Sequence, residues 1–319
     1  MSHEKIEIKQ SYKERINDLL KDESEIYFDY CFRPLKTFIR VNTLKISVEE
    51  LKKILREKNW KFEQPLKSFL EAIKIESRLS PGELGNCKEH QLGYYYVQEL
   101  SSMLPPLLLN PKEDEIIFDC CAAPGSKTTE VSALMKNKGL IVANDIKIDR
   151  IKALTTNLQR CGCMNIIVTK ANASGLAFRL KERNFYFDKI LLDAPCSGEG
   201  TIRKDLKTLK IWNENMIKKL SGNQKDLIKN CFAVLKKNGV MVYSTCTLAP
   251  EENEEVIDFL IKNYPTEVKI EDVKLEIKTR KGVTEWRNKK YDEQVKNCLR
   301  IYPQDNDCEG FFIAKIRRI

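Results

Sequence analysis

Residues 115–135, EIIFDCCAAPGSKTTEVSALM, form the stretch that decides the predicted fold. The apolar run at its start is typical of a strand that is buried on both faces. The small residues of CAAPGSKT (121–128) let the backbone approach a ligand closely, and Lys127 begins a predicted helix that extends to about Lys136. Because a helix N-terminus offers free N–H groups and a positive dipole, the loop predicts a site for a nucleotide-like ligand that carries a carboxylate. A tight turn without a ligand is the alternative.

The chain beyond this stretch continues the alternation of strands and helices. Apolar strands that alternate with helices are typical of a parallel sheet covered on both faces. We therefore predict an α/β fold. Strands are predicted over residues 115–122, 139–145, 165–170, 187–195, 239–247 and 309–318, and helices over 127–136, 148–160, 223–237 and 251–263.

The first part of the chain has a different pattern. Residues 4–30 are charged and helical in pattern, and residues 38–47 have the alternating apolar positions of a strand. Ser47 is a predicted N-cap for the helix that follows. We expect a small N-terminal α+β domain over residues 1–90 and an α/β domain over residues 91–319.

The composition argues against several classes of enzyme. The chain has 319 residues and a formal net charge of +9, but only two histidines, His3 and His90. Zinc hydrolases with an HExxH motif and zinc sites with three histidines are therefore excluded, and a serine or cysteine hydrolase would depend on His90 alone. The eleven cysteines form no CxxC pair, so no metal site is predicted and reduced thiols are expected.

Charge and hydropathy bear on the partners and the compartment of the protein. No apolar run reaches the roughly 18 residues of a membrane span, and the charged start lacks the apolar stretch of a secretory signal. We therefore expect a soluble, cytoplasmic protein without a membrane partner. Residues 200–240 contain ten Lys or Arg against three Asp or Glu, which indicates either a surface that faces a polyanion or a solvated, lysine-rich surface.

Small and polar residues follow the strands of the predicted sheet. Functional groups in such sheets gather at the carboxyl ends of the strands, so these residues are predicted to share one edge. Asp145 ends the second strand, where it would accept hydrogen bonds from ribose hydroxyls or cap the next helix. Asn172 follows the third strand and is interpreted as a contact to an adenine edge or as a turn residue.

Two cysteines and a carboxylate lie at the ends of the fourth and fifth strands. Asp193 and Cys196 belong to DAPCSG (193–198), and Cys246 belongs to STCT (244–247). An Asp at the end of an apolar strand is costly to bury without a partner. With no usable histidine, the two cysteines indicate nucleophilic thiolate chemistry in which no imidazole acts as the base. Structural roles for the cysteines are the alternative.

Taken together, these motifs resemble the Sun/nucleolar-protein family of RNA cytosine-5 methyltransferases, which use S-adenosylmethionine. The resemblance covers about residues 25–319 and is carried by DCCAAPGSKT (119–128), DAPCSGEGTIRKD (193–205) and YSTCTLAPEENEEVI (243–257). The paired PC and TC motifs separate this family from DNA cytosine methyltransferases, whose nucleophile is the cysteine of the PC motif. The resemblance implies a Rossmann-like class I methyltransferase sheet with helices on both faces and a small N-terminal domain that binds RNA.

The resemblance also implies roles for individual residues. Cys246 would attack C6 of a cytosine, Cys196 would assist product release, and Asp193 would contact N3 and the exocyclic amine. Asn172 and Ser126 stand where the family usually has Asp and Gly. The residues implied to hold S-adenosylmethionine are Cys121, Ala122, Ala123, Pro124, Gly125, Ser126, Lys127, Asp145, Arg150, Asn172 and Asp193.

The implied acceptor is RNA, with tRNA favoured over rRNA, and the protein is expected to act as a monomer. A cytosine must be unpaired or flipped out to reach a cleft. RNA contacts are predicted for Arg40, Asn42, Arg203 and Lys204. Two alternatives stay open: a methyltransferase of the same fold that modifies another atom, such as an exocyclic amine, and a non-catalytic RNA-binding or assembly factor.

Overall fold

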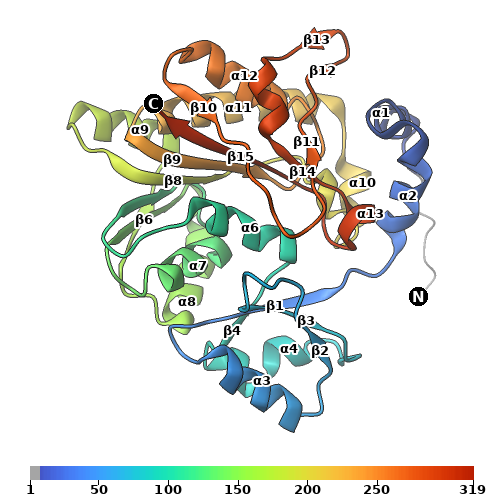
Figure 1. The fold of residues 1–319 in the computed structure, drawn as a ribbon, viewed down its shortest axis with the longest axis vertical. Helices are drawn as coiled ribbons and strands as arrows, with labels where there is room; N and C mark the ends of the chain where they lie inside the picture. The colour runs from blue at the N-terminus through green and yellow to red at the C-terminus, as the bar shows by residue number, and fades with distance from the viewer. Residues whose placement is uncertain (1–7) are drawn as a thin grey trace.

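Within residues 8–319, which are the part of the chain that the computed structural model describes, a nine-stranded mixed sheet forms the centre of the molecule (Figure 1). The first residues of the helix predicted over 4–30 lie outside this part. Five strands of the sheet are β5 (Ile116–Asp119), β6 (Leu140–Asp145), β7 (Ile166–Lys170), β8 (Phe187–Asp193) and β9 (Leu235–Thr245). They are parallel and lie in the order β9-β8-β5-β6-β7, as the alternation of strands and helices predicts.

The C-terminal part of the chain extends this sheet with antiparallel strands. Their bounds are β10 Val268–Ile270, β11 Arg280–Lys281, β14 Leu299–Ile301 and β15 Phe311–Arg318. β15 lies antiparallel beside β9, with β14 and then β11 beyond it, and β10 also pairs with β15. The predicted last strand is therefore present, but the sheet is mixed rather than wholly parallel. A separate hairpin consists of β12 (Glu285–Trp286) and β13 (Lys289–Lys290).

Helices cover both faces of the sheet (Figure 1). One face carries α6 (Leu100–Leu109), α7 (Ser126–Leu134) and α8 (Ile148–Cys161), and the other carries α9 (Ala173–Glu182), α11 (Glu214–Phe232) and α12 (Glu254–Asn263). Successive residues of a strand point to opposite faces. Ile117 of β5 therefore packs in the core with α6, α7 and α8, whereas Phe118 packs in the core with α9, α11 and α12. The α/β architecture is confirmed.

A second, antiparallel sheet forms the small N-terminal domain at the bottom of Figure 1. It consists of β1 (Thr37–Val41), β2 (Phe62–Glu63), β3 (Ala72–Ile75) and β4 (Tyr95–Val97), accompanied by α3 (Val48–Glu57), α4 (Glu83–Asn86) and α5 (Lys88–Gln91). Ser47 caps α3 as predicted, in a reciprocal pair of hydrogen bonds with Glu50. Because β4 pairs with β1, the small sheet extends to Val97, beyond the predicted boundary at residue 90.

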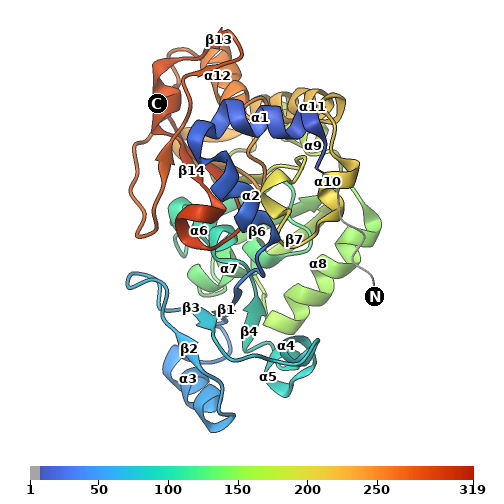
Figure 2. The ribbon, with the colours of Figure 1, turned by 90° about the vertical axis from the view of Figure 1, so that its right-hand side faces the viewer.

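The first helices pack on the large domain rather than on the small sheet, as Figures 1 and 2 both show. They are α1 (Gln10–Leu20), the 3-10 turn η1 (Lys21–Glu23) and α2 (Ser24–Phe32). Tyr12 of α1 packs edge-on against Trp212, with 5.0 Å between the ring centroids. Arg280 forms an ion pair with Glu23. This placement differs from the predicted domain division, in which all of the first 90 residues form one unit.

Four short helical segments complete the described fold. They are η2 (Glu199–Thr201), α10 (Lys207–Ile211), η3 (Glu293–Asn297) and α13 (Pro303–Asn306). Of the helices in residues 8–319, none combines the length and the apolar character needed to cross a membrane.

Candidate active site

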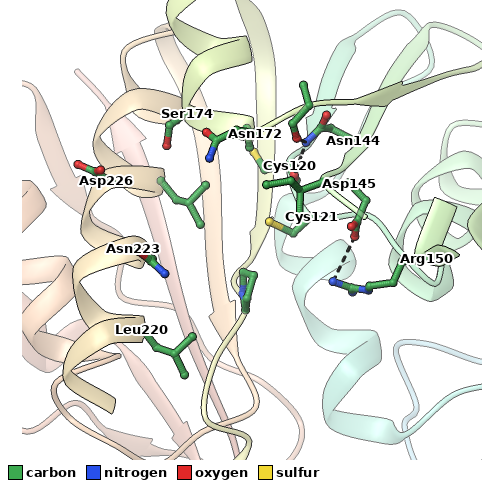
Figure 3. Close-up of a pocket in the computed structure, with 15 residues that line it drawn as sticks. Cys120, Cys121, Asn144, Asp145, Arg150, Asn172, Ser174, Leu220, Asn223 and Asp226 are labelled. Atoms are coloured by element: carbon green, nitrogen blue, oxygen red, sulfur yellow. Dashed lines mark hydrogen bonds and ion pairs between the residues drawn. The ribbon is translucent and has the colours of Figure 1, made fainter. Parts of the chain in front are cut away.

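The loops that follow β5, β6 and β8 meet at one edge of the sheet, as expected for parallel strands. Between these loops and α11 lies a cavity of about 290 Å³ (Figure 3). This volume is close to the ~300 Å³ at which small-molecule sites usually begin. Four residues of the predicted cofactor set line the cavity: Cys121, Asp145, Arg150 and Asn172.

One wall of the cavity comes from α11, which the sequence analysis did not include in the site. Leu220, Asn223 and Leu227 of this helix line the cavity, and Pro195 lines it from the loop after β8. Their spacing of three and four residues places the three helical positions on one helix face. That periodicity was visible in the sequence, but it is equally typical of a helix face buried in a core.

Asp145 has the environment expected of a ligand-binding carboxylate. It is 2% exposed, and its Oδ1 accepts a hydrogen bond of 3.0 Å from the backbone N–H of Lys147. Arg150 Nη1 lies 3.2 Å from Oδ2 in an ion pair, yet Oδ2 accepts no hydrogen bond from any described residue. A buried oxygen with this unused capacity suits the hydroxyl groups of a ribose. The alternative role as helix cap is not seen, because the N-cap residue of α8 is Lys147.

The CAAPGSK loop has a fixed shape set by its neighbours. The N–H of Ala122 donates to the carbonyl of Asn144 at 2.8 Å. Gly125 has φ 105°, and a Cβ at this position would lie 2.9 Å from the Leu154 side chain, so the turn into α7 requires glycine. Within the predicted set, the residues that shape the loop without lining the cavity are Ala122, Ala123, Pro124, Gly125 and Ser126.

Asn172 combines the two roles that the sequence left open. Its Oδ1 accepts a hydrogen bond of 3.1 Å from the N–H of Gly175 and so caps α9. The same side chain lines the cavity, on the opposite side from Arg150 (Figure 3). The turn role and the cavity role therefore coexist.

Cys196 and Cys246 lie in contact at the ends of β8 and β9. Their Sγ atoms are 3.3 Å apart, within hydrogen-bonding distance for sulfur. The hydrogen bond with Cys246, together with burial, raises the pKa of the Cys196 thiol well above its usual value. Cys196 is therefore a neutral thiol at pH 7. The predicted meeting of the two cysteines is thus present in the structure.

A buried lysine accompanies the carboxylate beside the cysteines. Lys127 Nζ donates to Asp193 Oδ2 at 2.7 Å and to Ser102 Oγ at 3.0 Å. The other oxygen of Asp193 accepts a hydrogen bond of 2.7 Å from Ser244 Oγ. Although burial opposes its charge, Asp193 keeps the pKa of Lys127 above its usual value, so the lysine is protonated. Both residues were predicted to hold the cofactor, but neither lines the cavity; they form a charged pair beside it.

Two of the predicted RNA contacts are buried between the domains, which corrects the prediction. Arg40 is 2% exposed; it donates to Gln98 and Thr129 at 2.8 Å each and lies 3.5 Å from Glu130. Asn42 is 1% exposed and donates to the carbonyls of Gly93 and Cys161, at 2.8 Å each. Both side chains fasten β1 to neighbouring elements and present no surface to RNA.

A third predicted RNA contact, Arg203, is likewise internal. Its guanidinium donates to the carbonyls of Pro34 and Cys308 and to the carboxylate of Asp307. Lys204, by contrast, has a side chain that is 69% exposed, and its Nζ lies 4.0 Å from Glu309. Of the four predicted contacts, Lys204 is thus the one whose exposure is compatible with binding RNA.

Comparison with known proteins places this geometry in a family. A family model described as 16S rRNA methyltransferase RsmB/F matches residues 106–317, and a model of the N-terminal domain of 16S rRNA methyltransferase RsmF matches residues 8–100. The chain belongs to the RsmB/F methyltransferase family. It is 43% identical over 297 residues to the tRNA (cytosine(49)-C(5))-methyltransferase of Pyrococcus abyssi, covering 93% of each chain. It is 40% identical over 320 residues to ribosomal RNA small subunit methyltransferase F of Vibrio parahaemolyticus, covering 99% of this chain but 64% of that relative.

Two solved structures share the fold of this RsmB/F family member over almost its whole length. A methyltransferase homolog protein from Pyrococcus horikoshii has a TM-score of 0.84 at 36% identity, covering 98% of this chain and 95% of that one. NSun6 from the same organism, solved with SFG, has a TM-score of 0.82 at 26% identity, covering 97% and 98%. SFG is an analogue of S-adenosylmethionine.

Family membership confirms the predicted class I fold, the cofactor and the enzyme class. The protein is an S-adenosylmethionine-dependent RNA (cytosine-5)-methyltransferase. This membership favours the leading prediction over both alternatives, the methyltransferase with another acceptor atom and the non-catalytic RNA-binding factor.

Proposed function

We propose that this protein methylates C5 of a cytosine in tRNA, with Cys246 as the nucleophile. The contact between the Cys246 and Cys196 thiols, beside the charged pair of Lys127 and Asp193, carries this proposal. The choice of tRNA is supported by sequence identity, which is 43% to the relative named for tRNA and 40% to the relative named for rRNA. We infer that the enzyme acts in the cytoplasm, because its substrate is RNA, and that it acts as a monomer.

The proposed reaction begins with a bond between sulfur and carbon. Cys246 gives its proton to a water molecule and its sulfur attacks C6 of the cytosine. The electron pair of the C5–C6 double bond moves onto C5, which becomes nucleophilic. S-adenosylmethionine supplies the methyl group that C5 acquires. A water molecule then takes the proton on C5, the C–H electron pair re-forms the C5–C6 double bond, and the C6–S bond breaks with return of its electron pair to Cys246. Cys196, a neutral thiol in contact with the leaving sulfur, assists this release.

The charged pair supplies the electrostatic part of the mechanism. Asp193 accepts hydrogen bonds from Lys127 and Ser244, so its carboxylate is fixed before the base arrives. It would accept a hydrogen bond from the exocyclic amine of cytosine, while the protonated Lys127 supplies a positive charge beside the ring. Fixed groups of this kind stabilise charge that develops in the reacting base without having to reorganise.

The residues of the cavity fit S-adenosylmethionine. Asp145 Oδ2, which accepts no hydrogen bond from the described residues, would take the ribose hydroxyls. Asn172 would face the adenine edge, and Leu227 of α11 offers an apolar wall to the ring. Cys121 lines the same cavity at the loop that leads into the N-terminus of α7, where free N–H groups favour a carboxylate. Lys204 would contact a phosphate of the RNA.

Two cysteine variants test the proposal on a denaturing gel of enzyme mixed with tRNA and S-adenosylmethionine. Cys246→Ala should give neither product nor a covalent band, and Cys196→Ala should give a covalent enzyme–RNA band because release is blocked. Cys163→Ala, a cysteine outside the site, serves as the control and should turn over like the parent protein. A Cys246→Ala protein that still forms methylated product would refute the assignment. Bisulfite sequencing of tRNA and rRNA treated with the enzyme identifies the substrate, and methylation of rRNA alone would refute the choice of tRNA.

A further inference from the structure

The turn over residues 250–253 is hydrogen-bonded to the segments that contain Cys196 and Cys246, and its last two side chains are buried. Glu252 and Asn253 are each 0% exposed. Neither residue takes part in the proposed chemistry. Their side chains nevertheless form hydrogen bonds with the residue after Cys196 and with the residues on both sides of Cys246.

Glu252 and a glutamine of α11 enclose the backbone around Cys196. Glu252 Oε2 accepts a hydrogen bond of 3.0 Å from the N–H of Ser197, the residue after Cys196. Gln224 Nε2 donates to the same oxygen at 2.9 Å and to the carbonyl of Pro195, the residue before Cys196, at 2.8 Å. The backbone on both sides of Cys196 is thus fixed by one connected set of hydrogen bonds.

Asn253 does the same for Cys246. Its Oδ1 accepts a hydrogen bond of 2.6 Å from the hydroxyl of Thr245, and its Nδ2 donates to the carbonyl of Thr247 at 3.0 Å. The two sets are joined to each other, because the hydroxyls of Ser197 and Thr247 are 2.7 Å apart. The residues that follow the two cysteines are therefore linked directly.

Asn253 contacts the Cys246 segment in place of a capping hydrogen bond to its own helix, α12. Asn253 is the N-cap residue of α12, a position where an asparagine side chain normally accepts a hydrogen bond from the first turn of the helix. Here its side chain makes no capping hydrogen bond. The helix forgoes this capping hydrogen bond, and the amide instead contacts the residues on both sides of Cys246.

We propose that Glu252 and Asn253 are positioning residues for the two catalytic thiols, with Glu252 assigned to Cys196 and Asn253 assigned to Cys246. The inference rests on the proposed roles of the cysteines. Since attack and release are separate steps, it requires that the two positioning residues affect different steps. Loss of the Asn253 contacts slows attack on C6, and loss of the Glu252 contacts slows release.

Attack is measured as the rate of covalent band formation in single-turnover reactions, in proteins that also carry Cys196→Ala. In this background, Asn253→Ala should slow band formation by about tenfold to 100-fold, the effect of a displacement near 1 Å at a reacting atom. Thr245→Val removes one hydrogen bond of the same set, keeps the side-chain shape, and should slow the step in the same direction by a smaller factor. This second variant keeps the test valid if Asn253→Ala does not fold.

Release is measured in proteins that retain Cys196. Glu252→Ala should accumulate the covalent band and slow product formation by about tenfold. Glu252→Gln, which retains an acceptor oxygen, should restore most of the release rate. Ser221→Ala is the matched control. Like Gln224, Ser221 is a buried residue of α11, and its hydroxyl donates to the carbonyl of Glu251 in the same turn. Its hydrogen bond does not go to the segment of either cysteine. Binding of S-adenosylhomocysteine should be equal in all variants.

The outcomes separate this inference from the proposed function. If the Cys196→Ala parent forms no covalent band, the proposed mechanism fails and the inference fails with it. If the parent forms the band but the Asn253 and Glu252 variants behave like Ser221→Ala, only the inference is overturned. Equal slowing of attack and release by both residues would show general structural support and would also overturn the inference.

Discussion

Replacement of Asp145 by Asn tests the cofactor site directly. The substitution keeps the shape of the side chain and an oxygen for the N–H of Lys147, but it removes the negative charge from the oxygen that has no hydrogen-bond donor among residues 8–319. A hydrogen bond to a charged group contributes about 1.5–3 kcal/mol. Loss of one such bond corresponds to about 10- to 150-fold weaker binding. We therefore expect Asp145→Asn to raise the Kd for S-adenosylhomocysteine by this factor.

The measurement is a calorimetric titration of the folded protein with S-adenosylhomocysteine, which needs no RNA. Asp149→Asn is the matched control, because it removes the same charge from the first turn of α8, where the side chain is 87% exposed. Its Kd should equal that of the wild-type protein. A Kd for Asp145→Asn within about threefold of wild type, with an unchanged melting temperature, would show that the ribose does not use this carboxylate.

Three further predictions concern stability and RNA binding. Arg300→Met leaves Glu254, its fully buried partner, without a counter-charge, so the free energy of unfolding in urea should fall by about 3–5 kcal/mol; a loss below about 1 kcal/mol would refute the importance of this pair. Burial raises the pKa of Asp119 to about 7, so the folded state holds this proton more tightly than the unfolded state. The resulting stabilisation is lost as the pH rises through about 7. Asp119→Asn should flatten this decline of the free energy of unfolding with pH, and an unchanged pH profile would contradict the assignment. Lys204→Ala should reduce the slope of log affinity for tRNA against log salt by about one, whereas Arg203→Ala should lower the melting temperature; the reverse pattern would overturn both interpretations.

The chemistry at the strand ends could be predicted from the sequence because it follows from topology. In a parallel sheet, every strand delivers its next residue to the same edge. Asp145, Asn172, Cys196 and Cys246 therefore meet near that edge although they are far apart in the chain. The order of strands and loops along the chain is sufficient to predict that these residues share one edge, and no individual contact between them is needed.

Three of the four predicted RNA contacts are buried, because burial of a polar or charged residue depends on its tertiary partners. Arginine is a residue type that commonly contacts RNA, but Arg40 and Arg203 each donate to acceptors in distant segments. These acceptors are Gln98 and Thr129 for Arg40, and Asp307 for Arg203. A buried arginine is tolerated when such partners surround it. Local sequence does not contain that information.

The extent of the small domain was misjudged for a related reason. β4 follows a turn-rich stretch that resembles a linker, and its pairing with β1 spans more than fifty residues of chain. The separate packing of α1 and α2 depends in the same way on distant apolar partners such as Trp212 and Tyr302. Helical periodicity predicts that a helix has a buried face, but not which surface covers it.

The buried polar side chains between the two domains have a consequence for substrate choice. Arg40 and Asn42, both on the β1 side, hydrogen-bond to α7 and to the end of α8, so the small domain has little freedom to swing. The distance from the surface of the small domain to the thiols of Cys196 and Cys246 is therefore fixed by the fold. An RNA that contacted both domains would have to offer its cytosine at that span, so its three-dimensional shape would contribute to selection.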